Sequence, residues 1–161
     1  MNLNPLDIII FAILIFFTIS GLNSKFISSI KTTINLIGSI FISSFILESA
    51  NTQFNLYFLN NPIVYLSMFI LILIITSLLI GFLLDFAIYQ LEDPDLDLNA
   101  DRGLGALIGL VRGFVITALM IFIFDTTPLS AEVKEKISRK MEVESFFFKP
   151  CSDLKEILIR D

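Results

Sequence analysis

The chain has 161 residues, of which 55% are hydrophobic and 17% are charged, and its formal net charge is −5. Soluble domains are typically about 45–50% apolar and about 25% charged, so this composition indicates a membrane protein. The 11 basic residues form no dense patch, which excludes nucleic acid as a partner. The lack of histidine and the single cysteine exclude most zinc sites, histidine-dependent catalysis and intrachain disulfides.

Residues 5–20 form the first apolar segment, which is predicted to be a membrane-spanning helix. Asn4 suits the N-cap, Pro5 suits the first helical position, and Asp7 falls in the first turn, where a negative charge is favoured. The segment has no basic region before it and no small-residue cleavage site. We therefore expect it to remain attached rather than to act as a signal peptide.

Residues 26–47 form the second and most polar predicted span. Its polar side chains recur at three- and four-residue steps and so share one helix face; they are Ser28, Lys31, Thr32, Asn35, Ser39 and Ser43. A polar face inside lipid must meet other protein or water. Hydrogen-bonded helix packing is the favoured interpretation, and a pore wall is the alternative.

Residues 63–86 form the third predicted span, which is almost entirely Ile, Leu and Phe and carries Asp85 near its end. An acidic connector at 92–97 follows. Its alternating acids resemble a calcium-binding loop, but Leu98 stands where that loop requires glycine and Leu104 where it requires glutamate. We therefore expect a solvated turn.

Residues 103–124 form the fourth predicted span. Gly105, Gly109 and Gly113 repeat every four residues and so form one smooth helix face, with Arg112 on nearly the same side. Asp101 and Arg102 join that face if the helix begins earlier. Such glycines weaken a helix in water but allow close helix approach in lipid. The spacing predicts tight packing, and the glycines match neither a dinucleotide fingerprint nor a phosphate loop.

An arginine within an apolar span is expensive and normally has a partner or a wet cavity. If the third and fourth spans are antiparallel, Arg112 lies near the depth of Asp85. We therefore expect Arg112 to pair with Asp85, or instead with the polar face of the second span.

Residues 127–161 differ from the rest of the chain because they mix charged and apolar residues. They are predicted to form one or two amphipathic helices on the membrane surface, or a partly frayed terminus. The sequence thus divides into a transmembrane part, 1–126, and this tail. Lys25 and Arg102 lie in the loops after the first span and before the fourth, which predicts cytoplasmic loops there and extracytoplasmic termini.

The residues quoted above resemble the colicin V production protein (CvpA) family. The likeness rests on the opening Asn-Pro-Leu-Asp-Ile-Ile at 4–9, on Gly21, and above all on the Asp-Arg-x-x-Gly-x-x-x-Gly-x-x-Arg-Gly segment at 101–113. One departure is Lys25, which stands where the family usually has a glycine. The resemblance implies a bacterial inner-membrane protein of about four spans, linked to colicin V production or export and to envelope integrity.

Three functions follow from these features. The favoured one is a non-enzymatic membrane protein, all-α and polytopic, that assembles with itself or with other envelope proteins and needs no metal or cofactor. The alternative is an oligomeric small channel or export component whose second and fourth spans line a path. A membrane enzyme is disfavoured, because Asp7 belongs at the opposite membrane face from Asp85 and Asp101.

Overall fold

The computed structural model describes residues 5–54, 61–88, 98–128 and 148–159; the acidic connector and most of the tail lie outside these ranges. The described residues are almost all helical and include no strand, which confirms the prediction of an all-α protein. The helices are α1 (Pro5–Asn23), α2 (Phe26–Phe54), α3 (Pro62–Ile88), α4 (Leu98–Thr126) and α6 (Phe148–Leu158).

Three of these helices, α2, α3 and α4, are long and apolar enough to cross a membrane. The fourth, α1, is also apolar but shorter, with 19 residues against the roughly 20 that a span needs. α1, α2 and α3 begin within one residue of the predicted positions, whereas α4 begins at Leu98, five residues before the predicted start; α2 and α4 are also longer than expected. Each has 29 residues, so both extend beyond the hydrocarbon or cross it at a tilt.

Two helix starts explain why the chain turns where it does. Asn61 caps α3, because its Oδ1 accepts a hydrogen bond of 3.0 Å from the Ile63 amide, and Pro62 occupies the first helical position. The start of α2 is capped from a distant part of the chain. The Phe26 amide donates to Asp101 Oδ1 at 2.8 Å, which joins the first turns of α2 and α4.

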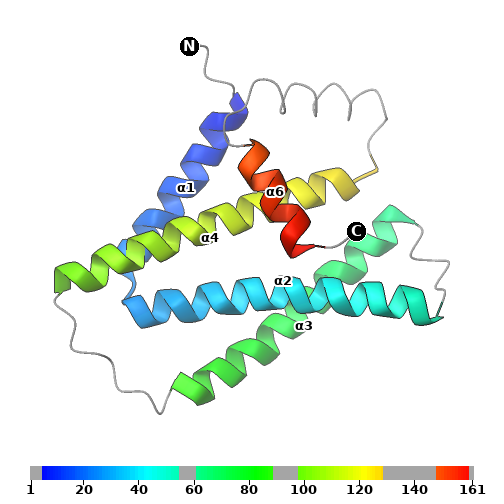
Figure 1. The fold of residues 1–161 in the computed structure, drawn as a ribbon, viewed down its shortest axis with the longest axis horizontal. Helices are drawn as coiled ribbons and strands as arrows, with labels where there is room; N and C mark the ends of the chain where they lie inside the picture. The colour runs from blue at the N-terminus through cyan, green and yellow to red at the C-terminus, as the bar shows by residue number, and fades with distance from the viewer. Residues whose placement is uncertain (1–4, 55–60, 89–97, 129–147, 160–161) are drawn as a thin grey trace.

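The helices alternate in direction and form a crossed bundle (Figure 1). The most extensive contact joins α1 to α4, and α2 lies beside both α3 and α4. The ends that carry Lys25, Asp85 and Asp101 therefore gather at one end of the bundle. The short α6 packs against α4 near the other end.

A hydrophobic cluster forms where α2, α3, α4 and α6 meet. Phe69 and Phe122 lie at its centre with ring centroids 4.9 Å apart. The buried members are Ile40, Leu47, Phe69, Val115, Phe122, Leu158 and Ile159. The end of the tail therefore contributes to the same core as the spans, and Lys155 of α6 pairs with Asp125 of α4 at 3.0 Å.

The outer face of the bundle is apolar. On α3, Leu78, Phe82 and Phe86 are each at least 70% exposed. In water such a surface would be an aggregation hazard, whereas hydrocarbon covers it without cost. The structure therefore describes a multi-pass membrane protein whose third helix is mainly bounded by lipid.

Candidate functional site

The glycine face of α4 lies directly against α1. A side-chain carbon built on Gly109 would lie 3.1 Å from both the Gly21 Cα and the Phe17 carbonyl carbon, and closer still to the Phe17 oxygen. On Gly105 it would lie 2.9 Å from the Ser24 oxygen, and it would also overlap the Gly21 oxygen. These neighbours are backbone atoms, which cannot turn aside as a side chain can. Only glycine fits at this crossing.

The contact between α1 and α4 is less tight on either side of Gly105 and Gly109. At Gly113 the nearest atom to an added carbon is Leu14 Cδ2 at 3.0 Å, which is the end of a flexible side chain. Gly103, two residues before Gly105, has nothing within 4 Å of an added carbon. The closest backbone approach therefore lies at Gly105 and Gly109.

Gly21 supplies the other half of this crossing. A carbon added there would overlap the Gly105 oxygen and lie 3.0 Å from the Gly109 Cα. Sequence reasoning treated Gly21 as the end of the first span and as part of the family resemblance, but did not name it as a packing residue. The sequence did carry a sign of this role, because a single glycine inside an apolar helix often allows another helix to pack closely.

Arg112 is buried on α4, with 7% of its surface exposed. Its Nε donates to Thr33 Oγ1 at 3.2 Å, and its Nη2 donates to the Ser29 carbonyl oxygen at 2.8 Å. Both acceptors belong to α2, and neither is charged. Among the described residues no carboxylate forms an ion pair with this guanidinium.

The expected pairing of Arg112 with Asp85 is not what the structure shows. Asp85 pairs instead with Lys31 of α2, and its carboxylate is 66% exposed at the outside of the bundle. Arg112 does meet α2, which was the other expectation, but it uses Ser29 and Thr33 rather than the predicted polar face. The reason is that α4 and α3 contact α2 on different sides.

The remaining charges at this end of the bundle have separate roles. Asp101 is half-buried and caps α2, as described above. Arg102 is exposed. The structure therefore does not gather Arg112, Arg102, Asp101 and Asp85 into one charged site.

The predicted polar face of α2 divides into two parts. Lys31, Asn35 and Ser39 face α3, where the Asn35 amide lies 3.4 Å from Ser77 Oγ and Ser39 is buried. Ser28 and Thr32 are exposed, and the Thr32 hydroxyl donates to the Ser28 carbonyl oxygen of its own helix.

Several polar contacts of α2 were missed by the sequence analysis. Ser29 and Thr33, which the predicted face did not include, face α4. Ser43, which it did include, has its Oγ 2.9 Å from Thr76 Oγ1 of α3, a partner that the sequence did not name. A signal for these contacts was present as the doublets Ser28-Ser29, Thr32-Thr33 and Ser43-Ser44. Adjacent residues lie about 100° apart around a helix, so Ser29 and Thr33 face α4 while Ser28 and Thr32 beside them are exposed.

The described residues contain no group of three or more His, Cys, Asp or Glu side chains that could hold a metal ion. Cys151 is fully buried in α6, and burial raises the pKa of its thiol to about 11. A thiol that stays protonated at neutral pH is a poor nucleophile. The glycines and the hydrogen bonds of Arg112 thus form contacts between helices.

Comparison with known proteins identifies the family. The chain matches the family described as "Colicin V production protein" over residues 6–155. It is also 42% identical over 57 residues to the "Colicin V production protein homolog" of Haemophilus influenzae, a match that covers 35% of each chain. No solved structure matches. Because the family match covers nearly all of the sequence, the chain belongs to the colicin V production protein family.

Proposed function

We propose that this protein is a non-enzymatic accessory or assembly factor of the bacterial inner membrane that supports colicin V production or export and envelope integrity. The family's description supports the link to colicin V production. The curated relative carries the same description but is matched over only about a third of its length, so the role of the whole protein is part of this proposal.

The observation that carries the accessory role is the internal use of polar groups. Asn35, Ser43 and Thr33 of α2 are engaged by α3 or α4, and the guanidinium of Arg112 is turned toward α2. A pore wall needs polar groups that face a continuous path. These contacts instead hold the helices together and leave apolar outer faces for lipid or for partner helices.

Orientation is part of the same proposal. The bundle end that carries Lys25, Lys31 and Arg102 has the excess of basic residues typical of cytoplasmic loops. We place this end in the cytoplasm and the N-terminus outside. Cysteine accessibility would test it: Cys151→Ser with Asn23→Cys should react with an impermeant maleimide only after the cells are opened.

The decisive experiment identifies partners. Crosslinking in intact membranes followed by mass spectrometry should recover the same envelope proteins, or a second copy of the chain, through the outer faces of α1 and α3. Purified protein in proteoliposomes should pass no ions or small solutes. Reproducible solute flux that disappears in Arg112→Met would refute the accessory role and favour the channel.

A further inference from the structure

The guanidinium of Arg112 uses only part of its hydrogen-bonding capacity. Nε and Nη2 donate to Thr33 and Ser29 of α2, as described above. The third nitrogen, Nη1, donates to no acceptor in the described part of the chain. It is not among the fully enclosed polar atoms that lack a partner there, which are the hydroxyl oxygens of Ser29 and Ser44. Nη1 therefore reaches the surface and is open to an acceptor from outside.

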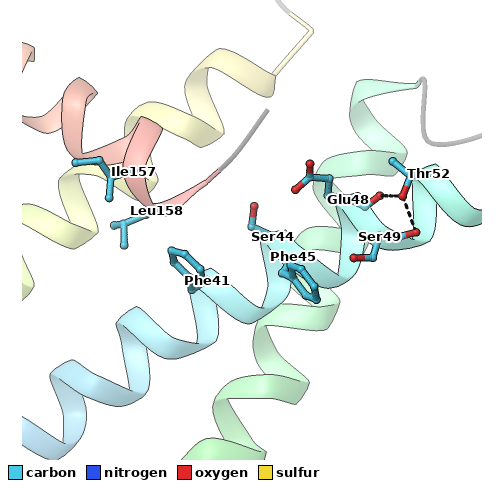
Figure 2. A pocket seen from close by; sticks show the side chains of 8 residues that line it. All are labelled: Phe41, Ser44, Phe45, Glu48, Ser49, Thr52, Ile157 and Leu158. Atoms are coloured by element: carbon cyan, nitrogen blue, oxygen red, sulfur yellow. Dashed lines mark hydrogen bonds between the residues drawn. The ribbon is translucent and has the colours of Figure 1, made fainter.

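One face of the α2–α4 pair continues beyond the part that α6 covers. On α2, Ile34 lies seven residues before Phe41, which lines a cavity beside Leu158 of α6 (Figure 2). On α4, Val111 lies four residues before Val115, which belongs to the same buried cluster as Leu158. Residues at these spacings share a helix face. Ile34 and Val111 therefore lie on the side of the α2–α4 pair on which α6 rests.

This continuation, which we call the open α2–α4 face, extends toward the end of the bundle that carries Asp101. Ile34 is 51% exposed, Val111 is 48% exposed, and Leu104, two turns before Val111, is 37% exposed. α1 lies on the other side of α4, because Gly109 at its crossing is about 200° around the helix from Val111. Figure 1 shows α6 crossing α4 in its second half, so α6 leaves this stretch uncovered.

The position of the guanidinium favours a carboxylate carried by a membrane helix. Segment 32–47 of α2 carries no charge. Thr33 lies about 10 Å from the middle of that segment, since each residue rises about 1.5 Å, whereas the hydrocarbon extends about 15 Å from its midplane. The guanidinium beside Thr33 therefore lies within the hydrocarbon, where an arginine is costly without a partner and lipid phosphates are absent. A helix can hold a carboxylate at this depth, and its ionic hydrogen bonds are stronger than those of neutral acceptors.

We infer that the open α2–α4 face binds a transmembrane helix of another membrane protein, whose aspartate or glutamate pairs with Arg112. The exposed apolar side chains pack against that helix, and Nη1 donates to its carboxylate. Charge complementarity then selects this helix over others of similar hydropathy. The inference rests on the proposed accessory role and names the kind of partner that this face takes. It also accounts for a buried charge that contributes little to stability by itself.

The probe for the test is a polyleucine transmembrane peptide with one aspartate about 10 Å from its middle and a dibromotyrosine beside it. The chain has no tryptophan, so Leu107→Trp introduces a single fluorescent reporter. Leu107 is 64% exposed and lies one turn before Val111. The full-length variant is reconstituted with the peptide in phosphatidylcholine vesicles at pH 7, where dibromotyrosine quenches the tryptophan on close contact. We expect the aspartate peptide to bind about three- to tenfold more tightly than one with asparagine there, because hydrogen bonds between charged groups are stronger.

Three further variants make the test specific. In the Leu107→Trp background, Arg112→Met keeps a similar volume and should bring the two peptides to equal affinity. Arg112→Lys keeps the charge and should retain part of the preference. Phe86→Trp in the unaltered chain is the matched control, because Phe86 is 70% exposed on α3 and should not distinguish the peptides.

Equal binding of the two peptides in Leu107→Trp, or a preference that persists in Arg112→Met, would overturn the inference. Loss of the preference when phosphatidylglycerol replaces part of the phosphatidylcholine would also overturn it, and would assign Arg112 to a lipid phosphate. Displacement of the peptide by an excess of the tryptophan-free Arg112→Met chain would assign the face to a second copy instead. None of these results refutes the accessory role, which solute flux in proteoliposomes tests separately.

Discussion

Adding one methyl group at Gly109 should separate α1 from α4. The new carbon would lie 3.1 Å from two backbone atoms of α1, where ordinary contact is 3.4–4 Å, and closer to a third. The whole of α1 must therefore move. Overpacking of this kind destabilises by about 1–3 kcal/mol. This exceeds the gain of up to about 1 kcal/mol from replacing glycine by alanine in a helix.

Gly103→Ala is the matched control, because it lies on the same helix with open space around it. Both variants gain the same helix propensity, so their free energies of unfolding should differ by the overpacking cost alone, about 1–3 kcal/mol. The assay is reversible unfolding in mixed micelles, followed by the far-ultraviolet circular dichroism of the helices. If Gly109→Ala unfolds at the same denaturant concentration as Gly103→Ala, the reasoning about backbone contact is refuted.

Three further outcomes follow from the charged and titratable groups. Arg112→Met should keep or slightly raise stability in micelles, because a similar volume replaces a buried charge that lacks a carboxylate partner; a loss above about 2 kcal/mol would contradict this. Exchanging the charges of Lys31 and Asp85 should recover most of the stability lost in each single charge reversal, with a coupling energy of about 0.2–1 kcal/mol. Exchanging the charges of Arg112 and Asp85 should recover none of it. Double-mutant cycles measure both coupling energies. Cys151 should react with maleimide at pH 8 only after unfolding, since its thiol is buried with a pKa raised to about 11. Fast labelling of the folded protein would contradict this. Because the pKa of the Cys151 thiol is higher in the folded than in the unfolded protein, the free energy of unfolding should fall as the pH rises from about 9 to about 11.

The spans and the glycine face could be predicted from the sequence because both are local properties. A long apolar run and a four-residue repeat of small residues need no knowledge of the rest of the fold. The partner of the glycine face could not be predicted in this way. The partner must be a helix that also lacks a side chain at the crossing point, and in the sequence of α1 the single Gly21 is the one sign of this.

The contacts of Arg112 show why depth in the membrane alone does not predict which residue pairs with it. Asp85 has a plausible depth, but Lys31 already neutralises it on the far side of α2. The Ser29 carbonyl and the Thr33 hydroxyl satisfy part of the guanidinium because they lie on the side of α2 that faces α4. To choose between these acceptors, one must know which side of α2 faces α4. The polar residues of α2 do not determine this until the neighbouring helices are placed.

The end of the tail illustrates the same limit. Leu154 and Leu158 share an apolar face that could rest on a membrane surface or on protein, and the sequence pattern is identical in both cases. In the structure, Leu158 joins the cluster around Phe122, and Lys155 pairs with Asp125. The choice depended on the surface that α4 and α2 together present to α6, which only the assembled bundle creates.

The most direct test of the account asks what touches the inner face of α1. A photoactivatable diazirine side chain of similar size in place of Leu14, which is 6% exposed and lies beside Gly113, would be activated in native membranes. The account predicts an intramolecular crosslink to residues 109–117 in the monomer band, identified by mass spectrometry. Crosslinks only to lipid, or only to a second copy of the chain, would contradict the claim that the glycine face of α4 is covered by the protein's own first helix.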